Sequence, residues 1–130
     1  ELHQAENVAA AIDARMNEVY VSQVKREKVR SEFGEFFQWS PVIEEQVCQP
    51  EKVLEQFSDL TAYRVGTGWA AYPQFKDSGL EGSDIILPSA QYMLELALTD
   101  YAQNKIISAL EIEPVYLRNE VTWKKLPGRE

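Results

Sequence analysis

Three stretches in the first half of the chain carry the apolar patterns of β-strands. Residues 8–12 are a continuous run of small apolar residues, which predicts a strand covered on both faces, although a short buried helix has the same pattern. Residues 19–24 form a β-branched and aromatic run. Residues 39–47 are a third candidate, in which Pro41 requires an edge strand or a strand start because proline cannot donate a ladder hydrogen bond. This order predicts an antiparallel meander of three strands.

A charged segment lies between the second and third of these strands, and the spacing of apolar residues changes after the third. Residues 25–32 alternate in sign without apolar periodicity, so we predict a solvated loop there and a chain reversal near Gly34. From Pro50, which suits a first helical turn, apolar residues recur at helical spacing as far as Phe57. Residues 63–65 then predict a strand that enters a glycine turn. The pattern therefore predicts an α/β fold in which β-α-β crossovers follow the meander.

The clearest helix in the sequence follows a proline at position 88. Ser89 is its natural N-cap. An apolar stripe then follows the i, i+3, i+4 spacing, and it predicts a helix face that packs against the sheet as core rather than holding a cofactor. The stripe consists of Ala90, Met93, Leu94, Ala97, Leu98 and Tyr101. Residues 106–113 are predicted to be a connection and residues 114–118 an extended piece.

Size, charge and cysteine content narrow the class of protein. The chain has 130 residues, of which 45% are hydrophobic, and this predicts a single globular domain. The net charge of −8 argues against direct binding to tRNA or DNA, which relies on clustered Lys and Arg. A single cysteine, Cys48, cannot form an internal disulfide and favours a cytoplasmic location. No apolar stretch is long enough to predict a membrane helix. Because the chain begins with Glu1 rather than methionine, we expect that an upstream segment has been removed.

Few residues are candidates for catalysis. His3 is the only histidine, and we expect it to lie in a frayed terminal segment, so we exclude a Ser-His-Asp triad, a Cys-His pair and a multi-histidine metal site within this piece. Cys48 precedes the predicted helix, whose dipole could stabilise a thiolate, but a structural thiol is the preferred interpretation. Asp13, Arg15 and Glu18 share one hairpin loop and could form an acid–base pair or a cation site. An ordinary loop ion pair is favoured instead.

One glycine-rich turn is a candidate for nucleotide binding. Gly66, Thr67 and Gly68 follow a predicted strand, where backbone N–H groups can approach a phosphate. The turn lacks the third glycine and the Lys-Ser/Thr of a phosphate-binding loop, so a tight turn that packs Trp69 is preferred. The basic residues between positions 124 and 129 could touch RNA or an acidic partner, but three charges supply little affinity. We expect no catalytic residue, no metal site and no cofactor in this chain.

Three stretches are more distinctive than these patterns. They are AAIDARMNEVY at residues 10–20, VGTGW at residues 65–69, and residues 113–128, which contain EPVYLRN and WKKLPG. Together they resemble the C-terminal half of the bacterial TsaB (YeaZ) family, and the resemblance extends over nearly the whole chain.

The resemblance implies both a fold and a function. The fold would be actin-like, with two ribonuclease H-like halves, of which residues 1–130 would be the single C-terminal domain and the N-terminal half would be absent. The function would be that of a non-catalytic scaffold subunit in the synthesis of N6-threonylcarbamoyladenosine, in tRNAs that read codons starting with adenine. Its partners would be the TsaD transferase, a paralogue, and the TsaE ATPase, with a possible homodimer of the full-length protein, only indirect contact with tRNA and no membrane. Older descriptions of the family as a glycoprotease-like metallopeptidase or a resuscitation-promoting factor supply the alternative.

Overall fold

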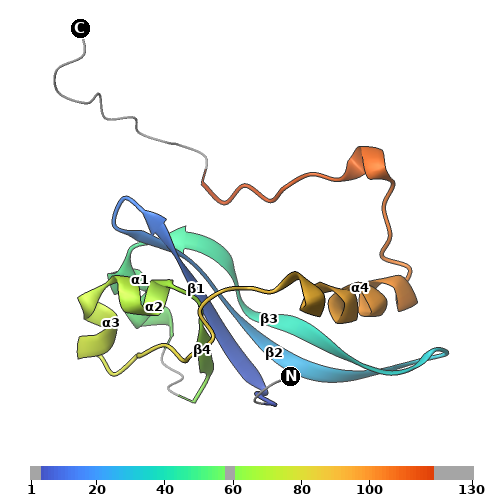
Figure 1. Cartoon of the computed structure of the whole chain (residues 1–130), viewed down its shortest axis with the longest axis horizontal. Coiled ribbons are helices and arrows are strands. Elements are labelled where there is room, and N and C mark those ends of the chain that lie inside the picture. Colours follow the sequence, from blue (N-terminus) through green and yellow to red (C-terminus); the bar gives the residue numbers. More distant parts are fainter. Residues whose placement is uncertain (1–3, 58–60, 119–130) are drawn as a thin grey trace, which may run out of the picture.

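One mixed sheet of four strands lies at the centre of the computed structural model, which describes residues 4–57 and 61–118 (Figure 1). The strands are β1 (Asn7–Arg15), β2 (Glu18–Ser31), β3 (Gly34–Cys48) and β4 (Tyr63–Val65). Their order in the sheet is β3-β2-β1-β4, in which β1 is antiparallel to β2, β2 is antiparallel to β3 and β4 is parallel to β1. The predicted α/β class is confirmed, and Pro41 lies in an edge strand as its chemistry requires.

The segment predicted to be a charged loop is instead a strand. β2 continues to Ser31 and pairs with β3 up to the reversal at Gly34, which has a φ of 117°. The two strands extend beyond β1 as a ribbon (Figure 1), so neither face of this part covers a core and the sequence shows no apolar alternation. Contacts between side chains of β2 and β3, rather than burial in a core, stabilise this part of the two strands. Arg30 Nε lies 2.9 Å from a Glu35 carboxylate oxygen, and the Arg26 guanidinium lies 4.6 Å from the centre of the Phe37 ring.

Three short helices cover one face of the sheet. They are α1 (Pro50–Gln56), α2 (Gly68–Ala71) and α3 (Pro73–Asp77), and Pro50 occupies the first turn of α1 as predicted. Alternate residues of β1 and β2 point to this face and are buried, as the period of two in a strand requires. The strand residues Ala9, Ala11, Val19 and Val21 form a core with the residues Val53, Phe57, Trp69 and Phe75.

The opposite face of the sheet is less well covered. Its side chains come from the intervening positions of β1 and β2, and they include Ala10 and Tyr20, which are half-buried. Ile12, on the same face, is 49% exposed. The apolar run at residues 8–12 predicts a strand covered on both faces, whereas the described residues cover one of the two.

The last helix departs most from its prediction. A 3-10 turn (Ala90–Tyr92) leads into α4 (Met93–Ala102), so the α-helix begins four residues after Ser89, whose side chain makes no capping hydrogen bond. The apolar stripe expected to pack on the sheet is exposed: Leu94 is 72% and Tyr101 64% accessible. Instead α4 lies beside the edge strand β3 (Figure 1), to which its inward-facing Thr99 donates a hydrogen bond. Helical spacing predicted the apolar face correctly, but not what that face touches.

After α4 the chain arches away from the sheet and returns to it near the β1–β2 hairpin (Figure 1). Within the predicted connection the chain forms one 3-10 turn (Ala109–Glu111), closed by a capping box between Ser108 and Glu111. The basic tail predicted between positions 124 and 129, and His3, lie outside the described residues. No helix in the described part of the chain combines the length and the apolar content that a membrane crossing requires.

Candidate functional site

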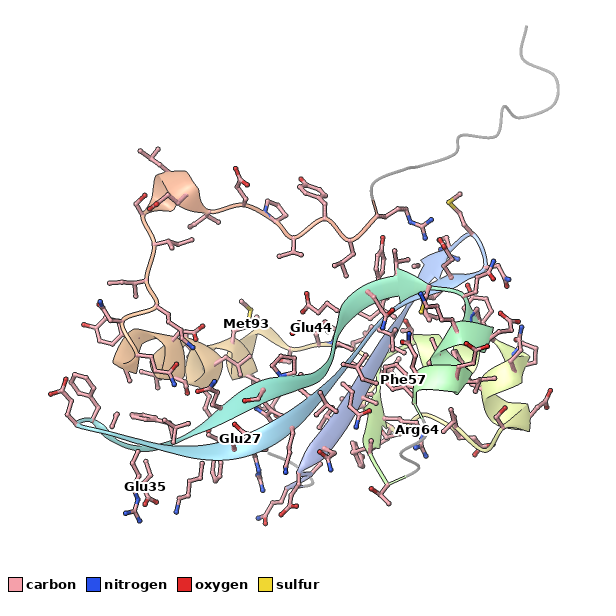
Figure 2. All side chains as sticks on the ribbon, turned by 180° about the vertical axis from the view of Figure 1, so that it is seen from behind. Glu27, Glu35, Glu44, Phe57, Arg64 and Met93 are labelled. Carbon is pink, nitrogen blue, oxygen red and sulfur yellow. The ribbon has the colours of Figure 1, made fainter. Side chains whose placement is uncertain are left out.

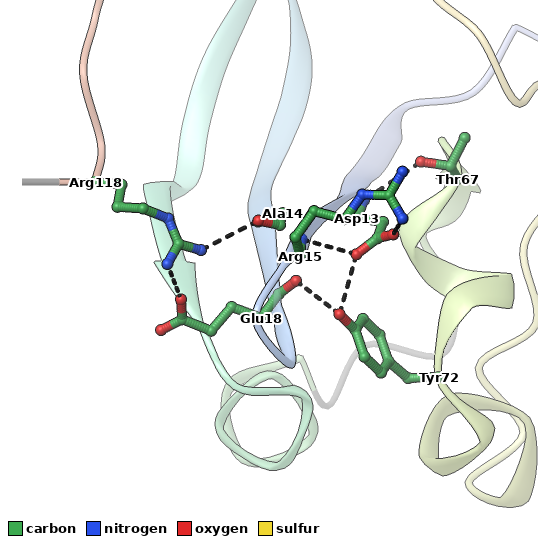
Figure 3. A network of polar contacts seen from close by, with 7 residues as sticks. All are labelled: Asp13, Ala14, Arg15, Glu18, Thr67, Tyr72 and Arg118. Carbon is green, nitrogen blue, oxygen red and sulfur yellow. Dashed lines mark hydrogen bonds and ion pairs between the residues drawn. The ribbon is translucent and has the colours of Figure 1, made fainter. Parts of the chain in front are cut away.

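The β1–β2 hairpin, where the sequence groups Asp13, Arg15 and Glu18, is the centre of a polar network (Figure 3). The turn is conformationally unusual, because Arg15, Met16 and Asn17 have φ values of 62°, 56° and 60°. Residues with side chains rarely adopt this left-handed region, and three in succession require stabilisation from neighbours. Asp13 provides part of it, since its Oδ1 accepts a hydrogen bond of 2.9 Å from the Arg15 backbone N–H.

Tyr72, which follows α2, connects the two sides of the hairpin. Its hydroxyl oxygen lies 3.0 Å from Asp13 Oδ1 and 3.1 Å from the backbone oxygen of Glu18, so its single proton can be donated to either acceptor (Figure 3). The predicted Asp13–Arg15 ion pair is also present, at 3.6 Å, although the Arg15 side chain is largely exposed. An ion pair of this kind contributes little. The hydrogen bonds are therefore the main connection.

The protonation states of Asp13 and Tyr72 suit a structural contact rather than proton transfer. The Arg15 backbone N–H, and secondly the Tyr72 hydroxyl, hold the pKa of the Asp13 carboxyl below its usual value. Burial, and secondly the hydrogen bond to Asp13, raises the pKa of the Tyr72 hydroxyl. Near neutral pH an acid of lowered pKa does not accept a proton readily, and a phenol of raised pKa does not release one. Both shifts favour the ionised carboxyl and the protonated hydroxyl, the states in which Tyr72 donates its hydrogen bond to Asp13.

This arrangement predicts a pH-dependent contribution to stability. Because the pKa of Asp13 is lower in the folded state, its ionised form stabilises the fold above the unfolded pKa, about 3.9, and the contribution is lost as pH falls through the folded pKa. We expect Asp13→Asn to lower the free energy of unfolding at pH 6 and to differ progressively less from the wild type below about pH 4. Urea unfolding of both proteins between pH 2 and 7 measures this difference.

A companion variant identifies the hydrogen bonds responsible. Tyr72→Phe removes the second contribution to the lowered pKa of Asp13 and leaves the first. The pH-dependent effect of Asp13→Asn on the free energy of unfolding should therefore be smaller in the Tyr72→Phe protein than in the wild type, but should not disappear. A difference between wild type and Asp13→Asn that stayed constant from pH 2 to 7 would contradict the assignment.

The glycine turn packs against β1 beside this network. A Cβ atom on Gly66 would overlap the backbone oxygen of Ala11, and a Cβ on Gly68 would lie 2.8 Å from the Ala11 carbonyl carbon. Thr67 between them accepts a hydrogen bond of 3.3 Å from the Asp13 backbone N–H. The glycines thus allow close packing, and Trp69 is buried as the sequence favours. Nucleotide binding by Gly66, Thr67 and Gly68 stays a prediction.

Arg118 joins the end of the described chain to the hairpin. Its guanidinium lies 2.6 Å from a Glu18 carboxylate oxygen and donates a hydrogen bond of 3.2 Å to the backbone oxygen of Ala14 (Figure 3). The side chain is only 13% exposed. A hydrogen bond with Tyr20 is the largest of the interactions that raise its pKa. Arg118 therefore attaches the end of the described chain to the hairpin through a charge-assisted contact.

Sequence reasoning grouped Asp13, Arg15 and Glu18 correctly but missed two of their partners. No local signal marks Tyr72, because its role depends on the packing of a short helix 59 residues after Asp13. Arg118 lies in a distinctive stretch, but its contact with Glu18 spans most of the chain. Long-range contacts of this kind have no signature in residue spacing.

Cys48 is the last of the candidate residues that lie in the described part of the chain. Cys48 is buried, and burial raises the pKa of its thiol, in agreement with a structural role. Among residues 4–57 and 61–118, no group of three or more His, Cys, Asp and Glu side chains could hold a metal ion. The network of Figure 3 joins the β1–β2 hairpin to the turn after α2 and to Arg118 through hydrogen bonds and ion pairs, and the prediction that the chain has no catalytic residue stays a prediction.

Comparison with known proteins assigns the chain to a family. No family model matches it. It is 72% identical, over all of its 130 residues, to the tRNA threonylcarbamoyladenosine biosynthesis protein TsaB of Haemophilus influenzae, and 43% identical over 97% of its length to the Escherichia coli protein of the same name. The chain belongs to the TsaB family. It spans about half the length of these relatives, 55% and 54% respectively.

Solved structures of the TsaB (YeaZ) family agree with this assignment. A Pseudomonas aeruginosa protein described as similar to the peptidase YeaZ superposes with a TM-score of 0.68 at 31% identity, over 88% of this chain and 50% of that one. YeaZ from the same organism gives a TM-score of 0.66 at 28% identity, over 87% and 49%. The network of Figure 3 joins the three stretches on which the TsaB resemblance rests, since Thr67 and Arg118 both bond to the hairpin.

Proposed function

We propose that this chain is one half of a non-catalytic scaffold subunit that acts in the synthesis of N6-threonylcarbamoyladenosine in tRNA. The 72% identity to a TsaB protein named for that pathway carries the proposal. The chemistry of the candidate site supports the non-catalytic part, because Asp13 and Tyr72 are held in the protonation states of a structural contact. The net charge of −8 favours protein partners over direct contact with tRNA.

The proposal extends to fold and partners. Three consecutive antiparallel strands followed by a strand parallel to the first are compatible with one ribonuclease H-like half of an actin-like protein. We propose that residues 1–130 form the C-terminal domain of such a two-domain protein. In the cytoplasm the whole protein would assemble with a TsaD-type transferase and a TsaE-type ATPase, and could form a homodimer.

Reconstitution of tRNA modification tests this function. The full-length protein that contains this chain is combined with the partner subunits, tRNA and the substrates of the pathway, and the modified nucleoside is measured by mass spectrometry. We expect modification to require the protein, and Tyr72→Phe to retain activity at a temperature where it stays folded, because Tyr72 stabilises the hairpin without taking part in chemistry. Modification at the same rate without the protein would disprove the scaffold role.

One observation keeps a peptidase as the second candidate. A structural relative is described as similar to a peptidase. A fluorogenic peptide or glycoprotein substrate, incubated with the full-length protein with and without a chelator, tests this directly. We expect no cleavage above the background of a mock purification. Cleavage that a chelator inhibits and that Asp13→Asn abolishes would favour the peptidase over the scaffold subunit.

A further inference from the structure

The outer half of the β2–β3 ribbon concentrates positive charge in an otherwise acidic chain. Four of the 13 Lys and Arg residues lie between positions 25 and 30, whereas the net charge of the whole chain is −8. Arg26, Lys28 and Arg30 alternate along β2, and the period of two in a strand places their side chains on one face. Their cross-strand neighbours in β3 are Trp39, Phe37 and Glu35, respectively. Only one of these three neighbours is therefore a carboxylate.

Glu35 pairs with two of the cations at once. The Lys28 ammonium, and secondly the Arg30 guanidinium, hold the pKa of the Glu35 carboxyl below its usual value. The side chains of Lys28 and Arg30 are nevertheless 58% and 84% exposed. Figure 2 shows Glu35 near the tip of the ribbon, on the side away from α4. Because one carboxylate serves two exposed cations, this face of the ribbon keeps an excess of positive charge.

The same residues lie on an open edge of the sheet. The pairing of β2 with β1 ends at Lys25, and the Arg26 backbone N–H makes one further bond, of 2.7 Å, to a backbone oxygen just before β1. Alternate residues of an antiparallel strand direct their backbone groups to opposite sides, so those of Lys28 and Arg30 point the same way as those of Arg26. In the described part of the chain, no strand pairs with β2 on that side beyond this point. We call residues 27–31 the cationic edge.

We propose that the cationic edge binds an extended acidic segment of a partner protein, which adds a strand beside β2. The added strand pairs its backbone with the free N–H and C=O groups of Lys28 and Arg30. Carboxylates at alternate positions of that strand lie on the same face as the two cations, with Cβ atoms about 5 Å apart. Charged side chains normally protect an open edge from pairing with other strands. Cations repel basic strands and attract acidic ones, so the charge of this edge selects its partner.

An acidic protein segment fits the edge better than RNA or a second copy of this chain. A nucleic acid can neutralise Lys28 and Arg30, but it has no peptide backbone to pair with the open edge. The net charge of −8 also repels a polyanion, and it repels another copy of the chain in the same way. A short acidic segment carries less charge and satisfies both the side chains and the backbone of the edge.

Peptide binding to the full-length protein that contains this chain tests the proposal. The probe is a short labelled peptide in which Glu and Val alternate, and its control is the same peptide with Lys in place of Glu. We expect fluorescence anisotropy to detect binding of the acidic peptide and not of the basic one. The backbone amides of Lys28 and Arg30 should exchange with solvent more slowly when the acidic peptide is bound, because strand pairing protects them.

A methylated peptide separates strand pairing from charge attraction. Methyl groups on the backbone nitrogens of its Glu residues remove hydrogen-bond donors and leave the carboxylates unchanged. We expect this peptide to bind at least about fivefold more weakly than the unmethylated one, because it cannot donate to the open edge.

Matched variants locate the contact. Lys28→Gln combined with Arg30→Gln should weaken binding of the acidic peptide at least about fivefold, because two ion pairs are lost. Lys52→Gln combined with Lys76→Gln removes the same charge from exposed positions on α1 and α3. This control should change binding by less than about twofold, because distant exposed charges are screened.

Four results would overturn the proposal. Failure of the acidic peptide to bind at about 1 mM, or equal binding of the acidic and basic peptides, would leave the cations as protection of the edge alone. Equal weakening by the two double variants would show that net charge attracts the peptide without a specific edge. Tighter binding of an oligouridine that depends on Lys28 and Arg30 would favour RNA instead. Self-association in sedimentation that the double variant at positions 28 and 30 abolishes would favour a second copy.

Discussion

Trp69→Ala should lower the free energy of unfolding by about 3–5 kcal/mol, the cost of emptying a large buried aromatic site. Trp69 is 2% exposed and lies between two aromatic side chains, with ring centres 5.1 Å from Phe75 and 6.3 Å from Phe57. Its indole N–H lies 3.1 Å from the backbone oxygen of Val65 and 3.3 Å from that of Ala9. One side chain thus connects α2 to both parallel strands, and its removal leaves a cavity and removes the indole hydrogen bond.

Urea unfolding followed by far-ultraviolet circular dichroism measures this loss, since the substitution removes a fluorophore. A loss of this size can exceed the stability of a small domain. Trp69→Phe is therefore included, because it keeps the aromatic packing, loses the indole hydrogen bond and should cost clearly less. Phe33→Ala, at a 61% exposed position, is the control and should change stability by no more than about 0.5 kcal/mol. Equal effects at positions 69 and 33 would refute the described core.

The second large effect is expected for Gly66→Ala, with a loss of roughly 2–4 kcal/mol. Gly66 has a φ of 100°, which L side chains rarely adopt, and an added Cβ would overlap the backbone oxygen of Ala11. That oxygen belongs to a central strand and cannot move without shifting β1. The substitution therefore combines conformational strain with a clash against backbone.

Gly79→Ala separates these two causes. Gly79 also has a positive φ, 73°, but a Cβ there would meet nothing within 4 Å. Strain alone should cost about 1 kcal/mol at this position. The difference between the two variants in urea unfolding gives the cost of the clash. Equal losses in the free energy of unfolding for the two variants would contradict the close approach of the glycine turn to β1.

Several elements could be predicted from residues alone because local chemistry decides them. Pro50 at the start of α1, the reversal at Gly34 and the glycine turn before Trp69 all depend on backbone preferences within a few residues. The charged half of β2 could not be predicted, since its strand conformation depends on pairing with β3 rather than on burial. A ladder of hydrogen bonds carries no hydrophobic pattern.

In the candidate site, too, the sequence predicted local contacts but not long-range ones. The grouping of Asp13, Arg15 and Glu18 follows from their nearness in sequence. Tyr72 and Arg118 contact that hairpin only because the fold brings together residues that are far apart in the sequence. The separation is 59 positions for Tyr72 and Asp13, and 100 or more for Arg118 and the hairpin. Sequence spacing holds no information about such contacts, because they depend on how the helices and the last segment pack.

The amino-acid sequence by itself determined the α/β class and, through three distinctive stretches, the TsaB family. Only the tertiary structure decided which apolar faces are covered. Residues 8–12 and the stripe on α4 carry the pattern of buried segments, yet one face of the first and most of the second are open in this chain. The physical reason is that periodicity reports which side of an element avoids water, whereas the identity of the covering layer depends on everything else that folds against it.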